Sequence, residues 1–348
     1  MSYRWYTERH DPVHDVHGSL SAIADLSLNF GVPEVQLLRS MRIKIHDLIQ
    51  PSSKCSAEQL LQLIDNIESL NVKIPELPFR AATIAAEQFS FPIGALLRSI
   101  ASIRSRLQLI VEYQQLINPL IRLETYQDKA YCYLLLSDRY GVGSRADFVF
   151  NYSAALVLAL LRDSAEVRPH VTVFLSTPEP RNVADHYHYL SDQMVFDASF
   201  NLIAIPISAL DQITQTAPSL SQKRYALACS DYKSRSRLSS SLIDECTRYI
   251  DSNLKMPSLG LASCAEHFHK STSTLKRKLK MHECSFQSVL DERIVLHSLK
   301  HLYQGDSVGT IASQLNYSNN ANFRRMFRRC TGVWPQPDQS RIFYPLWP

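Results

Sequence analysis

Between residues 261 and 279 the apolar side chains repeat at helical spacing, stop at a short break, and then repeat again. The first stripe lies at i, i+3, i+4 and i+7 and consists of Leu261, Cys264, Ala265 and Phe268. His269 and Lys270 interrupt it, and Ser271 is a good N-cap for a second helix with two inward leucines. Two short helices around a tight turn, the second one polar and basic, are typical of a helix-turn-helix that enters a DNA major groove.

The same pattern occurs a second time, between residues 308 and 329. Its first stripe is Ile311, Ala312 and Leu315, and its second is Phe323, Met326 and Phe327. Asn316 lies in the turn, where it can adopt the left-handed conformation usually taken by glycine, and Ser318 is the expected N-cap. Packing alone seldom produces two units of this kind, so the repeat favours DNA binding over a solvated basic surface.

A helix without internal Gly or Pro is predicted between the two units, over residues 283–303. At 1.5 Å per residue it would be about 31 Å long. One turn of B-DNA is about 34 Å long, so a single chain could place two recognition helices in successive major grooves of double-stranded DNA.

The expected DNA-binding residues are the capping and outward-facing side chains of the two second helices. They are Ser271, Ser273, Thr274, Lys276, Arg277 and Lys280 in the first unit, and Ser318, Asn320, Asn322, Arg324, Arg325 and Arg328 in the second. Arg can bond guanine bidentately and Asn can do the same with adenine, whereas Lys and Ser contact phosphates and fix the register.

The charge of the chain is divided unevenly along its 348 residues, for which two domains are the expectation. From residue 239 onward there are 14 Lys and Arg against 9 Asp and Glu, a balance of +5; the rest of the chain, with 23 against 24, balances at −1. A basic C-terminal domain is consistent with a polyanionic partner. The sequence shows no secretory signal, and no apolar run approaches the roughly 18 residues of a membrane span, so we expect a cytoplasmic protein.

The N-terminal part of the chain, residues 1–217, predicts an α+β domain. Helical periodicity prevails from about residue 20 to 121, and includes an amphipathic helix with a capping box between Ser56 and Gln59. Residues 124–138 and 146–156 are rich in Tyr, Phe and Val and are expected to form strands; a helix follows, and residues 170–180 again resemble a strand. Residues 217–240 lose periodicity, which makes 218–238 the linker and 239–348 the DNA-binding domain, with units at 261–280 and 308–329.

Catalytic and metal sites are not indicated. The chain has no glycine-rich phosphate loop, no nucleophile elbow and no paired-histidine zinc motif, and its seven cysteines lack a CxxC pair. His10, His14 and His17 are interpreted as solvated residues of an unstructured start rather than metal ligands. His186 and His188 are interpreted as polar positions of a strand or loop. We therefore expect no enzyme activity, cofactor or metal; the effector-binding residues stay unknown at this point.

The C-terminal third resembles the AraC family of bacterial transcription regulators. The resemblance rests on three ordered blocks: the L-x3-A-x2-F-x2-S-x3-L-x3-L string at 261–279, SFQ with its downstream Leu and Arg at 285–293, and the block from Ile311 to Pro335 that ends in TG-x2-P. The stretch from 171 to 210 has a weaker likeness to the sensor domain that a large subgroup of this family carries. The expected fold is thus an N-terminal α+β sensor domain followed by an all-α domain with two helix-turn-helix units.

The resemblance implies a transcriptional activator controlled by a small effector in the N-terminal domain, with RNA polymerase as a partner and homodimerisation as a further option. Base contacts would come from Ser273, Lys276 and Arg277, and from Asn320, Ala321, Asn322 and Arg325. In an alternative interpretation the N-terminal domain is a protein-interaction or dimerisation module without any ligand.

The sequence departs from the family pattern in two ways. His269 and Asn316 occupy the positions where each turn usually has glycine, so His269 must take a left-handed, positive φ or the first turn must relax. The tail after the second unit is rich in Pro and aromatic residues, where a short helix that begins Pro-Ser is expected. Of the two units, the first is expected to read DNA less strictly.

Overall fold

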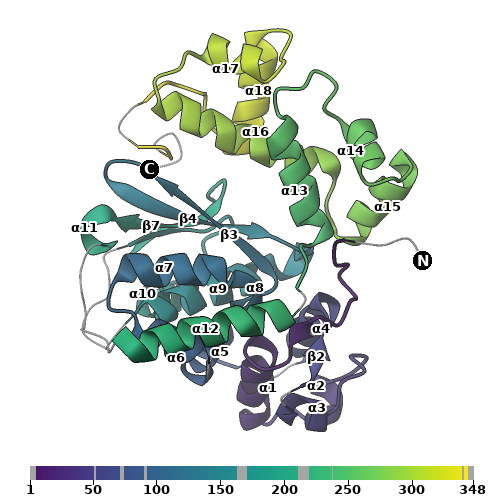
Figure 1. Cartoon of the computed structure of the whole chain (residues 1–348), viewed down its shortest axis with the longest axis vertical. Coiled ribbons are helices and arrows are strands. Elements are labelled where there is room, and N and C mark those ends of the chain that lie inside the picture. Colours follow the sequence, from purple (N-terminus) through teal and green to yellow (C-terminus); the bar gives the residue numbers. More distant parts are fainter. Residues whose placement is uncertain are drawn as a thin grey trace.

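The structure is a computed structural model of the whole chain, and it describes residues 5–50, 52–70, 74–89, 92–162, 171–210, 219–236, 238–338 and 341–343. A mixed sheet lies at its centre, with helices of the N-terminal domain on one side and the C-terminal helices on the other (Figure 1). This arrangement confirms the predicted α+β domain followed by an all-α domain.

Five strands form the sheet, in the order β3-β4-β7-β5-β6. Their bounds are β3 Ile121–Gln127, β4 Tyr131–Asp138, β5 Thr172–Phe174, β6 Gln193–Val195 and β7 Asn201–Pro206. β3, β4, β7 and β5 pair antiparallel, whereas β5 and β6 are parallel. Tyr131 pairs with Pro206 and Leu136 with Asn201, which fixes the register of the two central strands.

β4 is buried on both of its faces. Side chains of a strand alternate between faces, so Cys132, Leu134 and Leu136 pack with the N-terminal helices, while Tyr133 and Leu135 join the core of the C-terminal domain. The two domains therefore share the sheet. The DNA-binding domain, rather than helices of the N-terminal domain, covers the second hydrophobic face of the sheet.

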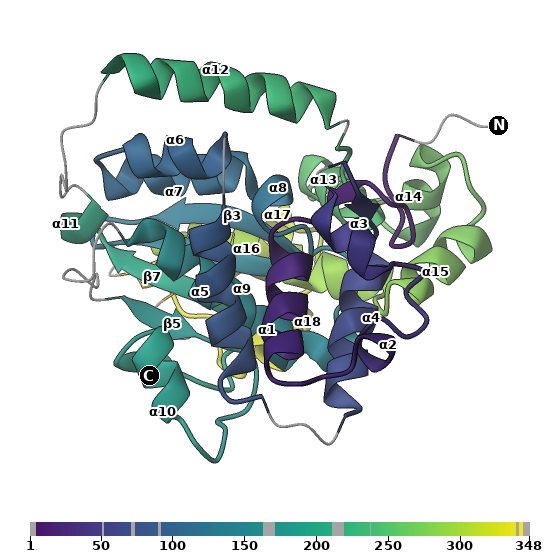
Figure 2. The ribbon, with the colours of Figure 1, turned by 90° about the horizontal axis from the view of Figure 1, so that it is seen from below.

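Helices of the N-terminal domain cover the other face of the sheet and extend away from it (Figure 2). Their bounds are α1 Ser19–Asn29, α2 Glu34–Leu37, α3 Ile45–Ile49, α4 Ala57–Glu68, α5 Leu77–Gln88, α6 Ile93–Ser99, α7 Ile103–Glu112, α8 Gln114–Ile117, α9 Ala146–Leu161, α10 Ala184–Tyr189 and α11 Ile207–Leu210. A short pair, β1 His14–Asp15 with β2 Lys54–Cys55, ties the start of the chain to α4. Ser56 accepts a hydrogen bond from the main-chain nitrogen of Gln59, as the capping box predicted.

Residues 146–156 correct one prediction, because they form the first part of α9 rather than a strand. The aromatic and branched residues there have high strand propensity, but α9 packs against α5 and is buried on nearly all sides. A helix inside a core can be apolar all round and then shows no helical period in its sequence.

Residues 219–235, which show no periodicity, form α12 Ser219–Arg235. This helix runs along the N-terminal domain beside α6 (Figure 2). Only a narrow stripe anchors it, since Tyr225, Cys229 and Tyr232 pack against the core between charged and Ser residues. Three apolar residues among so many polar ones do not give a clear amphipathic pattern in the sequence.

The C-terminal domain consists of helices. Two pairs of them, α14–α15 and α17–α18, are the two predicted helix-turn-helix units. The bounds are α13 Leu242–Asn253, α14 Leu261–His267, α15 Thr272–Met281, α16 Phe286–Tyr303, α17 Val308–Gln314 and α18 Asn320–Thr331. α16 lies across the sheet of the N-terminal domain and carries a unit at each end (Figure 1).

Candidate nucleic-acid interface

The first unit is a helix-turn-helix with the expected core. Cys264, Ala265, Phe268, Leu275 and Leu279 are all buried. His269 takes φ 51°, so the turn has the left-handed conformation without a glycine. Ser271 caps α15, because its hydroxyl oxygen accepts a hydrogen bond from the main-chain nitrogen of Thr274 at 3.2 Å.

Most of the expected DNA-binding side chains of α15 are exposed. They are Ser271, Ser273, Lys276, Arg277 and Lys280, while Thr274 is half-buried. Ser271 is within 3.1 Å of the Ser273 hydroxyl and 2.8 Å of the Thr274 hydroxyl, so these three polar groups form one cluster at the start of the helix. Lys278 of the same helix pairs with Glu8, whereas Lys276 and Arg277 form no ion pair with any of the residues that the structure describes.

The second unit has the same geometry. Asn316 takes φ 59° in the turn. The N-cap is Asn319 rather than Ser318, because the Asn319 side-chain oxygen accepts a hydrogen bond from the Asn322 main-chain nitrogen at 2.8 Å. Asn is as good an N-cap as Ser, so the sequence could not show which of these two adjacent residues caps α18. Ser318 stays exposed just before the cap, 3.4 Å from the Asn322 amide nitrogen.

The outward face of α18, like that of α15, is basic. Asn320, Ala321, Asn322, Arg324, Arg325 and Arg328 are all exposed. Arg325 donates to the Asn322 side-chain oxygen at 2.7 Å, which orients the guanidinium along the helix. Arg329 differs from its neighbours, because it is paired with Asp291 of α16.

The helix between the units is shorter than predicted. α16 begins at Phe286, after a Ser285 cap, and its 18 residues are about 27 Å long. Glu283 takes φ 52° and therefore belongs to the turn that precedes the helix.

The described start of the chain, from residue 5, packs against the first unit, which corrects the interpretation of residues 5–18 as unstructured; residues 1–4 lie outside the described residues. Trp5 stacks on Phe268 with ring centroids 5.9 Å apart, and its edge contacts His269. Thr7 forms a parallel bridge with Ser241, the N-cap of α13. His14 is buried in β1, where burial first and then Arg139 lower its pKa to about 3.

Glu8 connects this N-terminal segment to the recognition helix of the first unit. Its carboxylate accepts a hydrogen bond from Lys278 of α15 and lies 3.2 Å from the His282 ring nitrogen. Burial would raise the pKa of Glu8, but the hydrogen bonds from His282 and Lys278 outweigh it and lower the pKa to about 2. Glu8 is therefore an ionised, buried contact between the N-terminal segment and the first unit.

Two arginines of the N-terminal domain converge on the turn after α15. Arg9 and Arg145 each lie 3.0 Å from the same carboxylate oxygen of Glu283, and Arg145 also pairs with Asp65 at 2.6 Å. The main chains of the two domains also approach each other closely at this turn. Gly141 takes φ 84°, and a Cβ there would lie 1.8 Å from the main-chain oxygen of His282.

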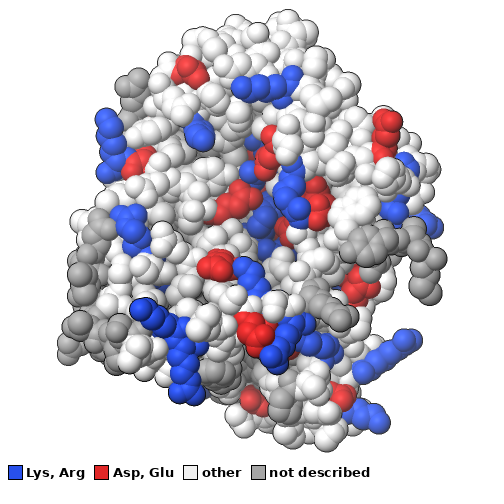
Figure 3. Space-filling model, in the orientation of Figure 1, with Lys and Arg blue, Asp and Glu red and all other residues white. Residues whose placement is uncertain are grey.

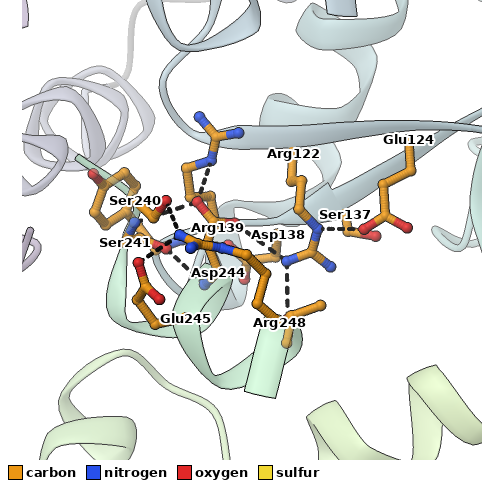
Figure 4. Close-up of polar contacts among 12 residues, drawn as sticks. Arg122, Glu124, Ser137, Asp138, Arg139, Ser240, Ser241, Asp244, Glu245 and Arg248 are labelled. Carbon is orange, nitrogen blue, oxygen red and sulfur yellow. Dashed lines mark hydrogen bonds and ion pairs between the residues drawn. The ribbon is translucent and has the colours of Figure 1, made fainter. Parts of the chain in front are cut away.

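A cluster of buried charges joins the sheet to α13 (Figure 4) and extends to α16. Arg122 of β3 lies 3.3 Å from Asp244 of α13 and 3.3 Å from Glu292 of α16. Arg139, directly after β4, also lies 3.0 Å from Asp244. Burial lowers the pKa of Arg139, an effect that Asp244 opposes. Opposite charges gather along the seam between the two domains in the space-filling view (Figure 3).

The seam also contains a cavity of about 430 Å³ beside this cluster. It is lined by residues of both domains and of α12, among them Gln114, Arg139, Lys233, Asp244 and Arg248. The cavity thus lies where a bound molecule would contact the sheet, the connecting helix and α13 together.

The C-terminal tail contacts the shared face of the sheet, which the sequence did not predict. Phe343 is fully buried, with its ring centroid 4.8 Å from that of Tyr133. The Ile342 main-chain nitrogen donates to Asp128 at 3.0 Å, and Asp128 also accepts from the Tyr133 hydroxyl at 2.6 Å. These contacts hold the end of the second unit against the N-terminal domain.

A metal site is not evident in the part of the chain that the structure describes. No group of three or more His, Cys, Asp or Glu residues there could hold a metal ion. His186 lies in α10 and is packed against the Phe79 ring at 5.0 Å, so it belongs to a helix and not to a strand or loop. One segment, residues 143–161, has the length and composition of a membrane span, but most of it is buried inside the protein.

Comparisons with known proteins agree with this geometry. Residues 31–213, more than half of the chain, match the model of the arabinose-binding domain of the AraC transcription regulator, and residues 264–339 match a helix-turn-helix domain model. No curated protein matches.

Two solved structures are distantly similar to this chain. The transcriptional regulator CdpR from Pseudomonas aeruginosa is 18% identical, with 91% of this chain and 96% of that chain covered and a TM-score of 0.42. A DNA-binding transcriptional dual regulator from Escherichia coli K-12 is 26% identical over 27% of this chain and 89% of that chain, with a TM-score of 0.25. Taken together, the matched N-terminal model, the matched helix-turn-helix model and the two units in the structure identify this chain as a member of the AraC family of transcription regulators.

Proposed function

We propose that this chain is a sequence-specific activator of transcription whose DNA binding is controlled by a small effector in the N-terminal domain. The observation that carries the DNA-binding part is the pair of exposed, basic recognition helices at the two ends of α16. The proposed DNA contacts are the expected DNA-binding residues of the first and second units. Among them Arg325 is proposed to read a guanine, because Asn322 already orients its guanidinium group.

The DNA-binding proposal is tested by selecting binding sites from a random duplex library with the full chain, and then measuring affinity for the selected site. Arg325→Ala should cost about 1–3 kcal/mol and relax specificity at one base pair. Lys276→Ala should weaken binding to all sequences more evenly if it contacts a phosphate. Unchanged affinity and selectivity of the Arg325 variant would remove Arg325 from the set of base contacts.

Effector control is supported by the direct contact between the domains. The DNA-binding domain covers one face of the sensor sheet, so a molecule that changes the sheet or the seam changes the arrangement of the two units. The cavity of about 430 Å³ in the seam is within the size range of small-molecule sites.

A second candidate function is a protein-interaction or dimerisation module in place of an effector sensor. Thermal-shift screening with a metabolite library distinguishes the two, because a ligand that binds the folded state raises the midpoint of unfolding. Hits that also change DNA affinity support effector control. No hit, together with a concentration-dependent dimer in light scattering, supports the interaction module. Transcription in vitro with purified RNA polymerase tests activation, and the cytoplasmic location is tested by cell fractionation.

A further inference from the structure

A hollow of about 630 Å³ lies beside the recognition helix of the second unit. The segment after α18 turns back along the helix, and its residues 334–337 form one wall. The remaining lining comes from Val308, Ala321, Arg324 and Arg325. The hollow is therefore part of the same surface that carries the proposed base contacts.

The charged residues that line the hollow are of one sign. Arg324 and Arg325 line it, Arg328 borders it, and its lining contains no acidic residue. Among the described residues no carboxylate pairs with any of these three arginines, whereas the adjacent Arg329 is neutralised by Asp291. The field in the hollow thus favours an anion, and unpaired guanidinium groups at a surface readily bind phosphate.

Trp334 gives the hollow an aromatic wall. Its side chain is 46% exposed, which is unusual for so large an apolar group, and the Arg328 guanidinium lies 4.6 Å from the centre of its ring. Pro335 and Pro337 restrict the backbone on either side of Gln336, so the wall loses little backbone freedom when a partner binds.

We propose that this hollow binds one sugar-phosphate strand of the DNA duplex whose major groove α18 enters. Arg324 and Arg328 bond its phosphates, and Trp334 packs against a deoxyribose and donates its indole N–H to a phosphate oxygen. The inference rests on the proposed DNA binding of the second unit. It assigns the Pro- and Trp-rich segment 334–337 a role in positioning the recognition helix rather than in reading bases.

The first experiment follows Trp334 itself in the full chain. The chain has three tryptophans, so Trp5→Phe with Trp347→Phe leaves Trp334 as the sole tryptophan, which is excited selectively at the long-wavelength edge of its absorption band, where tyrosine does not absorb. Quenching by acrylamide is measured with and without a saturating duplex of arbitrary sequence, several helical turns long, at low salt, where binding is dominated by phosphates. The Stern–Volmer constant should fall at least about twofold on DNA binding. Quenching that stays unchanged on saturated DNA overturns the proposal.

The second experiment measures affinity for two unrelated duplexes over a range of salt concentrations. Trp334→Ala should weaken binding about fivefold to 20-fold on both duplexes, and Trp334→Phe should recover part of the loss. Arg328→Gln should reduce the slope of log affinity against log salt by about 1, whereas the matched variant Arg329→Gln should leave it nearly unchanged. Circular dichroism and the thermal midpoint of each variant check that it is folded.

The outcomes separate this inference from the proposed function. If the wild-type chain binds no duplex, the proposed DNA binding fails. If the wild type binds and Trp334→Ala binds equally well, only the inference is overturned. If Trp334 becomes protected as protein concentration rises in the absence of DNA, a second copy of the chain occupies the hollow, which also overturns it.

Discussion

The two helix-turn-helix units have nearly the same internal geometry, but they are attached to the N-terminal domain in different ways. The first is held by charged and aromatic contacts from the N-terminal segment and from residues 141–145. The second is held by its tail, through Phe343, and by a hydrogen bond from Ser199 to the main-chain oxygen of Thr331. The difference indicates that pH and salt act mainly on the first unit, whereas loss of apolar contact acts on the second.

The strongest test of this comparison removes the tail contact. Phe343→Ala should destabilise the full chain by about 3–5 kcal/mol, because it empties a fully buried aromatic site between the domains. Urea unfolding measures the change, and Tyr187→Ala, at an exposed aromatic residue, is the control, with an expected change within about 0.5 kcal/mol. Equal stability of the Phe343 and Tyr187 variants would show that the tail does not hold the second unit.

The close approach at the first unit is tested by Gly141→Ala. The new Cβ would meet the main-chain oxygen of His282, so the first unit must move away from the sheet or the chain must lose stability. We expect a loss of about 2 kcal/mol beyond that of Gly31→Ala. Gly31 also has positive φ but open space around its Cβ position, so it reports the backbone strain alone, about 1–2 kcal/mol. Thermal midpoints that fall equally in the two variants would contradict the close contact.

A smaller effect, with a distinct pH dependence, is expected from Glu8→Gln. The pKa of Glu8 is lowered to about 2 in the folded chain, so its contribution is complete above the ordinary value of 4.5 and is lost as pH falls from 4.5 toward 2. At pH 7 the variant should be less stable by about 1–3 kcal/mol, and the difference should shrink in that acid range. Glu34→Gln, at an exposed glutamate, is the control. A difference that is constant from pH 7 to pH 2 would exclude the ionised Glu8 contact.

The smallest effects are expected from glycine substitutions in the turns of the two units. His269→Gly should stabilise the first unit by about 0.5 kcal/mol, since relief of the left-handed strain slightly exceeds the entropy cost of glycine. Asn316→Gly should change stability by about zero, because Asn tolerates this conformation better than His. Hydrogen exchange of the flanking helices measures both. A larger gain in stability from Asn316→Gly than from His269→Gly would contradict the prediction that His269 is the more strained of the two residues.

Prediction from the sequence succeeded where the pattern is local. Each unit has its caps, turn and apolar stripe within one short stretch of chain, so the fold of both units and the exposure of their basic faces could be predicted. It failed for residues 146–156, because a helix buried on all sides has no periodicity. It also failed for the N-terminal segment and the tail, whose partners lie far away along the chain, as the contacts of Glu8 with His282 and of Ile342 with Asp128 illustrate.

The sequence by itself determined that this chain has two basic helix-turn-helix units behind an α+β domain, because helix caps and hydrophobic periods are encoded by neighbouring residues. Only the tertiary structure decided how the units are attached. The second face of β4 is as apolar as the first, and a strand pattern does not say what covers each face. The charges of Arg122, Arg139 and Asp244 likewise look solvated in sequence, and only packing of the two domains removes them from water and joins them into one cluster.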